Sequence, residues 1–136
     1  MKKIKVGAGA AIIKDKKLLL TKRLDTDDKF PSCWTFPGGG YDSQDGSLLV
    51  TTKREMKEEL GIDFFPHEKL NFYESVYDDT LIISHVFLGK WSGEMNFDTS
   101  EICEIGWFTY DETKTLDIAF AYAETIEDLK KKSLID

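Results

Sequence analysis

The sequence contains few of the residues that mark disulfide-bonded, zinc-binding or membrane-spanning proteins. Only two cysteines and two histidines occur, and Cys33 and Cys103 lie far apart without a Cys-x-x-Cys spacing. This argues against a structural zinc site and predicts two free thiols, as in a reducing compartment. The chain also lacks a run of about 20 apolar residues and a short apolar segment after Met1. We therefore expect no membrane span, no secretory signal and a cytoplasmic location.

Negative charge predominates, but it is unevenly distributed. The formal net charge is −7, although residues 1–23 hold eight Lys or Arg and a single acidic residue, Asp15. We expect the acidic remainder to repel long nucleic acids, whereas the basic N-terminal segment could attract a small polyphosphate. The alternative is that these lysines keep an edge hairpin soluble and unpaired.

Hydrophobic periodicity predicts one α/β domain over residues 1–136. A chain of 136 residues with 41% hydrophobic residues can bury one core. Strands are predicted at 4–13, 18–23, 34–36, 70–77, 81–91 and 104–110, and helices at about 47–61 and 118–134. Leu24 to Cys33 is predicted to be a loop. His85 alternates with apolar residues and is predicted to be a satisfied core histidine. Together the elements predict an α/β/α sandwich with a mixed central sheet between two helices.

The first predicted helix carries a concentrated acidic face. Glu55, Glu58 and Glu59 fall within one arc of about 100° on a helix with 3.6 residues per turn. Ser47 or Asp45 can cap its start, and Gly61 stands where a C-cap is expected. Such closely spaced carboxylates repel one another, and a hard divalent cation with oxygen ligands would offset the repulsion. The alternative is a solvated helix face with interleaved basic residues.

This helix and the preceding glycines resemble the box of the Nudix hydrolases, G-x5-E-x7-R-E-U-x-E-E-x-G-U, where U is a bulky aliphatic residue. The matching residues are Gly40, Arg54, Glu55, Met56, Glu58, Glu59, Gly61 and Ile62. The resemblance implies the Nudix fold across essentially the whole chain. It also implies hydrolysis, with Mg²⁺ or Mn²⁺, of a small nucleoside diphosphate derivative: a nucleoside triphosphate, a nucleotide sugar or a dinucleoside polyphosphate.

The same resemblance suggests roles for individual acidic and basic residues. It implies that Glu55, Glu58 and Glu59 bind the metal and that one of them orients or deprotonates the attacking water. Arg54 is expected to form an ion pair that fixes a glutamate. Members of the family often add a carboxylate from the loop before the last strand, and the candidates here are Glu101 and Glu104, for which a plain surface loop is the alternative.

Substrate contacts are expected from the segment ahead of the helix. Gly38, Gly39 and Gly40 allow the backbone to turn tightly and approach the site closely, which a Cβ would obstruct. Arg23 is a candidate for contacting phosphate. Trp34 could stack on a base, although a place in the core is an equal alternative.

The sequence departs from the box at Gly46, where the first glutamate is expected. The preceding loop looks one residue longer than usual, so Asp42 or Asp45 is a candidate replacement. The departure motivates an alternative function, a non-catalytic nucleotide sensor. A third possibility, an isopentenyl diphosphate isomerase of the same fold, would need His and Cys residues at spacings that this chain does not offer. A monomer and a homodimer both stay open.

Overall fold

The computed structural model describes residues 3–136, so Met1 and Lys2 of the basic N-terminal segment lie outside the described part. None of its helices is both long and apolar enough to span a bilayer. The strands are β1 (Lys3–Ala11), β2 (Ile13–Lys14), β3 (Lys17–Arg23), β4 (Trp34–Thr35), β5 (Gly38–Gly40), β6 (Asp63–Tyr77), β7 (Thr80–Ser92) and β8 (Ile102–Phe108). The helices are η1 (Ser43–Asp45), α1 (Leu48–Leu60), α2 (Tyr110–Thr113) and α3 (Tyr122–Lys131).

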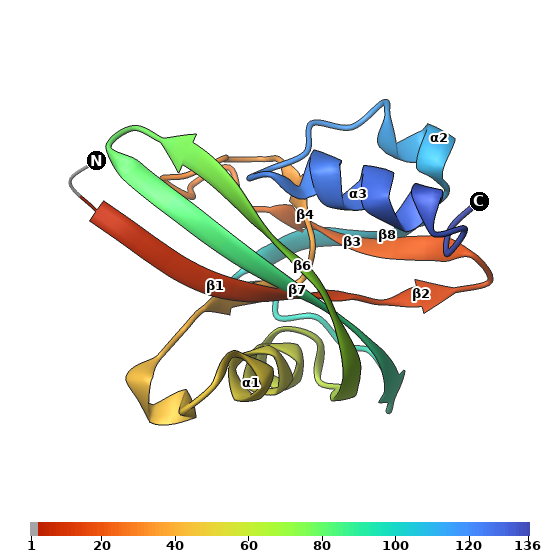
Figure 1. Cartoon of the computed structure of the whole chain (residues 1–136), viewed down its shortest axis with the longest axis horizontal. Helices are drawn as coiled ribbons and strands as arrows, with labels where there is room; N and C mark the ends of the chain where they lie inside the picture. Colours follow the sequence, from red (N-terminus) through yellow and green to blue (C-terminus); the bar gives the residue numbers. More distant parts are fainter. Residues whose placement is uncertain (1–2) are drawn as a thin grey trace.

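The strands form two four-stranded sheets between two main helices. One sheet has the order β5-β1-β7-β6, in which β1 and β7 are parallel and the other pairs antiparallel. The second contains β2, β3 and β4, with β8 paired to β3. Figure 1 shows α1 on one side of the sheets and α3 on the other. The predicted α/β sandwich with a mixed sheet is confirmed.

Each helix covers its own hydrophobic cluster. On the α1 side, Met56 and Leu60 are fully buried against small residues of β1, including Ala8 and Ala10. On the α3 side, Tyr122 and other apolar residues of the helix pack with residues of β3, β6 and β7. Burying a large apolar side chain contributes about 1.5–3 kcal/mol, so these stripes fix how both helices are rotated against the sheets.

Several predicted boundaries are wrong. Strand β6 begins at Asp63 instead of residue 70, because register shifts near Pro66 and Lys69 let its polar N-terminal half stay paired with β7. Helix α3 begins at Tyr122 instead of residue 118, since Ile118 forms a parallel bridge with Trp34. The last strand spans residues 102–108 instead of 104–110.

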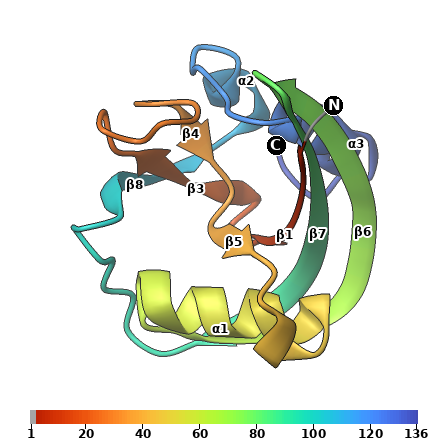
Figure 2. The same ribbon diagram turned by 90° about the vertical axis from the view of Figure 1, so that its left-hand side faces the viewer.

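The glycine segment predicted to be a turn is instead strand β5. It pairs antiparallel with β1, with Gly7 opposite Gly40 and Gly9 opposite Gly38. A Cβ on Gly7 would lie only 2.8 Å from the Gly39 carbonyl oxygen, so the two strands meet where both lack side chains. Figure 2 shows β5 leading from β4 past β1 toward η1 and α1. This short strand holds the backbone beside the acidic helix.

Candidate functional site

Helix α1 is fixed at both ends by caps that its sequence supplies. The Ser47 Oγ accepts a hydrogen bond from the Val50 N–H at 3.2 Å, so Ser47 is the N-cap. Gly61 ends the helix in the left-handed region, with φ 69°, which favours glycine. The buried apolar stripe then turns the acidic face toward β5.

Glu59 is the most buried carboxylate of this face, with 8% of its surface exposed. Its Oε1 accepts a hydrogen bond from the Gly38 N–H at 2.7 Å, which links α1 to β5. Burial is the main cause that raises the pKa of Glu59 to about 8, and the charges of Glu55 and Glu101 contribute to the same shift. The Gly38 N–H and the positive charge of Arg23 oppose that shift. These carboxylates therefore share one region of strong negative potential.

Glu55 lies against β5 at a position that requires glycine. A Cβ on Gly39 would lie 2.5 Å from the Glu55 carboxyl carbon. Burial raises the pKa of Glu55, an effect that Arg54 opposes and that the charges of Glu58 and Glu101 reinforce. Glu58 lies further out, with 56% of its side chain exposed.

Arg54 connects the carboxylates of the motif. Its Nε and Nη2 donate to the two Asp45 carboxylate oxygens at 2.7 and 2.9 Å, a bidentate pair. Its Nη1 lies 2.8 Å from Glu55 Oε1 and 3.2 Å from Glu58 Oε2. The expected ion pair between Arg54 and a glutamate is therefore present, and a single guanidinium orients three carboxylates.

The two candidate replacements for the absent box glutamate have different surroundings. The Asp45 carboxylate is 5% exposed, and its contacts with Arg54 hold its pKa well below the usual range. Asp42 accepts from the Gln44 N–H at 2.9 Å and caps η1, away from Arg54. Gly46 follows η1 with φ 76°, in the left-handed region. Asp45, the residue directly before Gly46, therefore forms the ion pair with Arg54.

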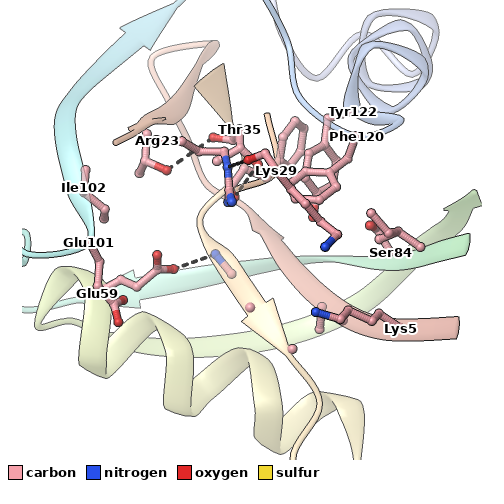
Figure 3. A pocket seen from close by; sticks show the side chains of 18 of the residues that line it. Lys5, Arg23, Lys29, Thr35, Glu59, Ser84, Glu101, Ile102, Phe120 and Tyr122 are labelled. Carbon is pink, nitrogen blue, oxygen red and sulfur yellow. Dashed lines mark hydrogen bonds between the residues drawn. The ribbon is translucent and has the colours of Figure 1, made fainter. Parts of the chain in front are cut away.

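A cavity of about 300 Å³ opens beside this acidic group. Glu59 and Glu101 lie on one side of it, and Arg23 lies on another, as Figure 3 shows. The segment Gly38–Gly40 forms part of its wall. The structure therefore brings together five of the predicted substrate and metal residues, namely Arg23, Gly38, Gly39, Gly40 and Glu101, around the cavity that Glu59 enters.

Five predicted site residues are not among those that line the cavity, namely Trp34, Arg54, Glu55, Glu58 and Glu104. Trp34 is 8% exposed and packs edge-on against Phe108, with ring centroids 5.0 Å apart, so it belongs to the core. Glu104 is exposed on β8, in register with Lys22. His85 is only partly buried and its Nδ1 has no hydrogen-bond partner among the described residues, so the prediction of a satisfied core histidine is wrong. The predicted free thiols of Cys33 and Cys103 are confirmed.

The aromatic residues of the cavity were missed by the sequence analysis. Phe120 lies 5.2 Å from the Arg23 guanidinium, and Tyr122 stacks on Phe36 at 4.7 Å between centroids. Both Phe120 and Tyr122 line the cavity (Figure 3). The pattern had placed both in a closing amphipathic helix, and helical spacing alone carries no sign that the start of that helix faces a cavity.

The donor chemistry of the acidic group fits a hard divalent cation. Carboxylate oxygens are ligands that Mg²⁺ prefers, and crowded, partly buried negative charge favours a cation as it favours a proton. Within residues 3–136, no group of three or more His, Cys, Asp or Glu side chains is already arranged to hold a metal ion. Arg54 engages Glu55, and the Gly38 N–H engages Glu59. A cation would have to compete with these contacts.

Comparisons with known proteins all point to the same protein family. The family model of the NUDIX domain matches residues 3–129. An m7GpppN-mRNA hydrolase of Danio rerio is 38% identical over 85 residues, which cover 57% of this chain and 28% of that protein. An uncharacterized Nudix hydrolase, YfcD, of Salmonella typhi is 27% identical over 96 residues, or 71% of this chain and 52% of its own length. The matched regions thus span 28% and 52% of these two relatives.

Solved structures show the same fold over nearly the whole chain. A MutT NUDIX hydrolase from Burkholderia pseudomallei matches with a TM-score of 0.82 and 27% identity, covering 94% of this chain and 99% of that one. The MutT protein from Methanosarcina mazei Go1 matches with a TM-score of 0.85 and covers 98% of both chains. At 21% identity, the second likeness shows the fold alone.

Proposed function

Because this chain belongs to the Nudix hydrolase family, we propose that it is a divalent-metal-dependent hydrolase that cleaves a phosphoanhydride bond in a nucleoside diphosphate linked to another group. The observation that carries the proposal is that Glu59 and Glu101 line one side of a cavity whose other walls hold cationic and aromatic side chains, with the charge of Glu55 close enough to act on Glu59. Hydrolysis adds one water across the anhydride and releases a nucleotide and a second phosphate-bearing product.

The residues proposed to hold the metal are Glu55, Glu58 and Glu59 of α1, with Glu101 from the loop before β8. When bound, Mg²⁺ or Mn²⁺ supplies charge neutralisation of the phosphates and lowers the pKa of a coordinated water. Arg54 keeps the Glu55 and Glu58 carboxylates side by side, and the Gly38 N–H fixes Glu59. One of these carboxylates is proposed to orient or deprotonate the attacking water.

The substrate is proposed to lie along the cavity with its diphosphate beside the carboxylates. Arg23 is held for this task, because its Nε donates to the Lys29 carbonyl at 3.0 Å and its guanidinium lies over the Phe120 ring. The rings of Phe120 and Tyr122 offer apolar surface to a nucleoside, since aromatic and apolar walls are typical of small-molecule pockets.

The deciding experiment is a hydrolysis screen of the purified chain with Mg²⁺ or Mn²⁺. The panel contains nucleoside triphosphates, nucleotide sugars and dinucleoside polyphosphates, together with an m7GpppN cap analogue, because one relative is named as a hydrolase of that structure. Metal-dependent release of a nucleotide from at least one member is expected. Hydrolysis of none, with nucleotide binding retained, would favour the non-catalytic sensor.

A further inference from the structure

One face of β1 combines a cationic side chain with two glycines, of which Gly7 lines the cavity. On this face Lys5 is followed by Gly7 and Gly9, since side chains alternate along a strand. A Cβ on Gly9 would lie 2.8 Å from the Tyr122 hydroxyl oxygen. Gly7 pairs in register with Ser84 of β7, which also lines the cavity. Beside the long cationic side chain of Lys5, the cavity wall is therefore the backbone of Gly7, which has no side chain.

A second lysine reaches the same part of the cavity from a distant element. Lys29 belongs to the segment between β3 and β4, and Figure 3 shows the Lys5 and Lys29 side chains extending into the cavity beside Ser84. Among residues 3–136, the Lys5 ammonium forms no ion pair within 4.0 Å. The Lys29 ammonium lies 3.7 Å from Asp28, whose side chain is 90% exposed.

The ammonium groups of Lys5 and Lys29 make fewer contacts with other protein groups than the neighbouring Arg23 guanidinium does. Arg23 donates to the Lys29 carbonyl and lies 3.6 Å from Asp27, so protein groups fix its position beside the carboxylates. The pair of Lys29 with Asp28 is weak, because its Asp28 carboxylate is almost fully exposed to water and the two charged atoms lie 3.7 Å apart. Lys5 and Lys29 are thus two cationic groups that face the cavity and remain available to a ligand.

From this geometry we infer that Lys5 and Lys29 are specificity-determining residues that bind an anionic group of the substrate beyond the diphosphate held at the carboxylates. The inference rests on the proposed function and narrows its substrate class from nucleotide sugars to nucleotides with a third phosphate, of which nucleoside triphosphates are the simplest. Lysine ammonium groups bind phosphate well, whereas the uncharged hexose of a nucleotide sugar gains nothing from two such groups.

The test compares substrates that share a nucleoside and differ in the charge of the distal group. Two matched pairs serve, UTP with UDP-glucose and GTP with GDP-mannose, assayed with the full chain at saturating Mg²⁺. The parent is expected to prefer the triphosphate in each pair. Lys5→Met and Lys29→Met should each lower kcat/KM for the triphosphate about 10-fold, mostly through a higher KM, because a charge-assisted contact is lost. Hexose substrates should stay within about twofold.

The control is Lys3→Met, which removes the same charge two residues earlier on β1, outside the cavity lining. It should leave both substrate classes unchanged. Equal losses for triphosphate and hexose substrates, or a parent that prefers the hexose, would overturn the assignment. If the parent hydrolyses no pair, the wider hydrolysis screen decides the proposed function separately, and calorimetric binding still tests the inference. UTP must then bind more tightly than UDP-glucose and lose that advantage in Lys5→Met.

Discussion

The acidic and basic walls of the cavity are built in opposite ways. The acidic wall contains Glu59, which the Gly38 N–H holds, and Glu101, while Arg54 fixes Glu55 on the same helix as Glu59. The basic wall comes from β1, β3 and the segment after β3, where Lys29 pairs with the exposed Asp28 and Lys5 forms no ion pair among residues 3–136. The acidic wall is thus held in place by the protein itself, whereas the ammonium groups of the basic wall can still pair with a ligand.

This difference indicates that the acidic wall carries the catalytic groups and the basic wall determines substrate selectivity. Groups that act on the reacting atoms benefit from fixed positions, because misplacement of a catalytic group is costly. Groups that recognise a distal phosphate need only opposite charge within reach, which a flexible lysine supplies. Changes to the acidic wall should therefore affect every substrate, and changes to the basic wall should distinguish among them.

The largest effect is expected from removing the most buried charge of the acidic wall. Glu59→Gln keeps the shape of the side chain and should lower kcat at least about 100-fold, or about 3 kcal/mol, for every substrate hydrolysed. Turnover at saturating Mg²⁺ measures this, with circular dichroism to verify folding. Glu68→Gln on β6, far from the cavity lining, is the matched control. Activity within threefold of the parent would show that this wall is not the site.

A steric change should disturb the same wall without removing a charge. A Cβ introduced by Gly39→Ala would lie 2.5 Å from the Glu55 carboxyl carbon, so the Glu55 side chain or β5 must move. Overpacking of this kind costs about 1–3 kcal/mol, and we expect activity to fall about 10-fold or more. Chemical denaturation and turnover measure the two effects. Gly40→Ala is the control, because its added Cβ would meet nothing within 4 Å. Equal behaviour of the two variants would contradict the packing argument.

Stability without metal should fall as the pH rises. Burial raises the pKa of Glu59 to about 8 in the folded protein, whereas an unfolded glutamate has a pKa of about 4.3. The folded state thus binds a proton more tightly, and this stabilisation is complete below about pH 4.3 and lost as the pH rises through about 8. Melting temperatures in EDTA from pH 5 to 9 should decrease, and Mg²⁺ should raise them most at high pH. A Glu59→Gln variant with the same slope as the parent would exclude Glu59 as the cause.

Smaller effects are expected where the chain departs from the Nudix box. Gly46 has φ 76° and open space around it, so Gly46→Glu should cost about 1 kcal/mol through backbone strain alone. Gly46→Asn should cost less, because asparagine tolerates the left-handed region. Denaturant titration ranks the two variants. If Gly46→Glu instead reached half-maximal activity at a lower metal concentration, with unchanged stability, a glutamate at this position would reach the metal.

Asp45 offers a complementary test of the same departure. Its pKa is depressed mainly by hydrogen bonds from Arg54, so its stabilisation is present above the ordinary aspartate pKa and is lost as the pH falls through the folded value. Asp45→Asn should lower the melting temperature at pH 7 and leave that at pH 2 closer to the parent. Asp42→Asn, which alters only the cap of η1, should have the smaller effect. Equal effects would contradict the assignment of Asp45 as the main partner of Arg54.

Local sequence determined the parts of this protein that follow from spacing along one element. Helical periodicity placed Glu55, Glu58 and Glu59 on one face, Ser47 and Gly61 ended the helix as expected, and apolar alternation located most strands. These features could be predicted because caps and side-chain direction depend on neighbours within a few residues. The Nudix resemblance added the fold class, which the sheets and helices confirm.

Only the tertiary structure decided which distant residues share the cavity. The separation of Lys5 and Lys29 along the chain does not indicate that both line one cavity. Phe120 and Tyr122 have the spacing of ordinary residues in an amphipathic helix. The glycines of β5 form a strand because they meet Gly7 and Gly9, and no side-chain periodicity can reveal a pairing between residues without side chains. The sequence leaves two places open for Trp34, stacking on a base or packing in the core, and its contact with Phe108 shows that it lies in the core. Such contacts depend on how separate elements pack, a sum of many small burial energies that no single segment of the sequence contains.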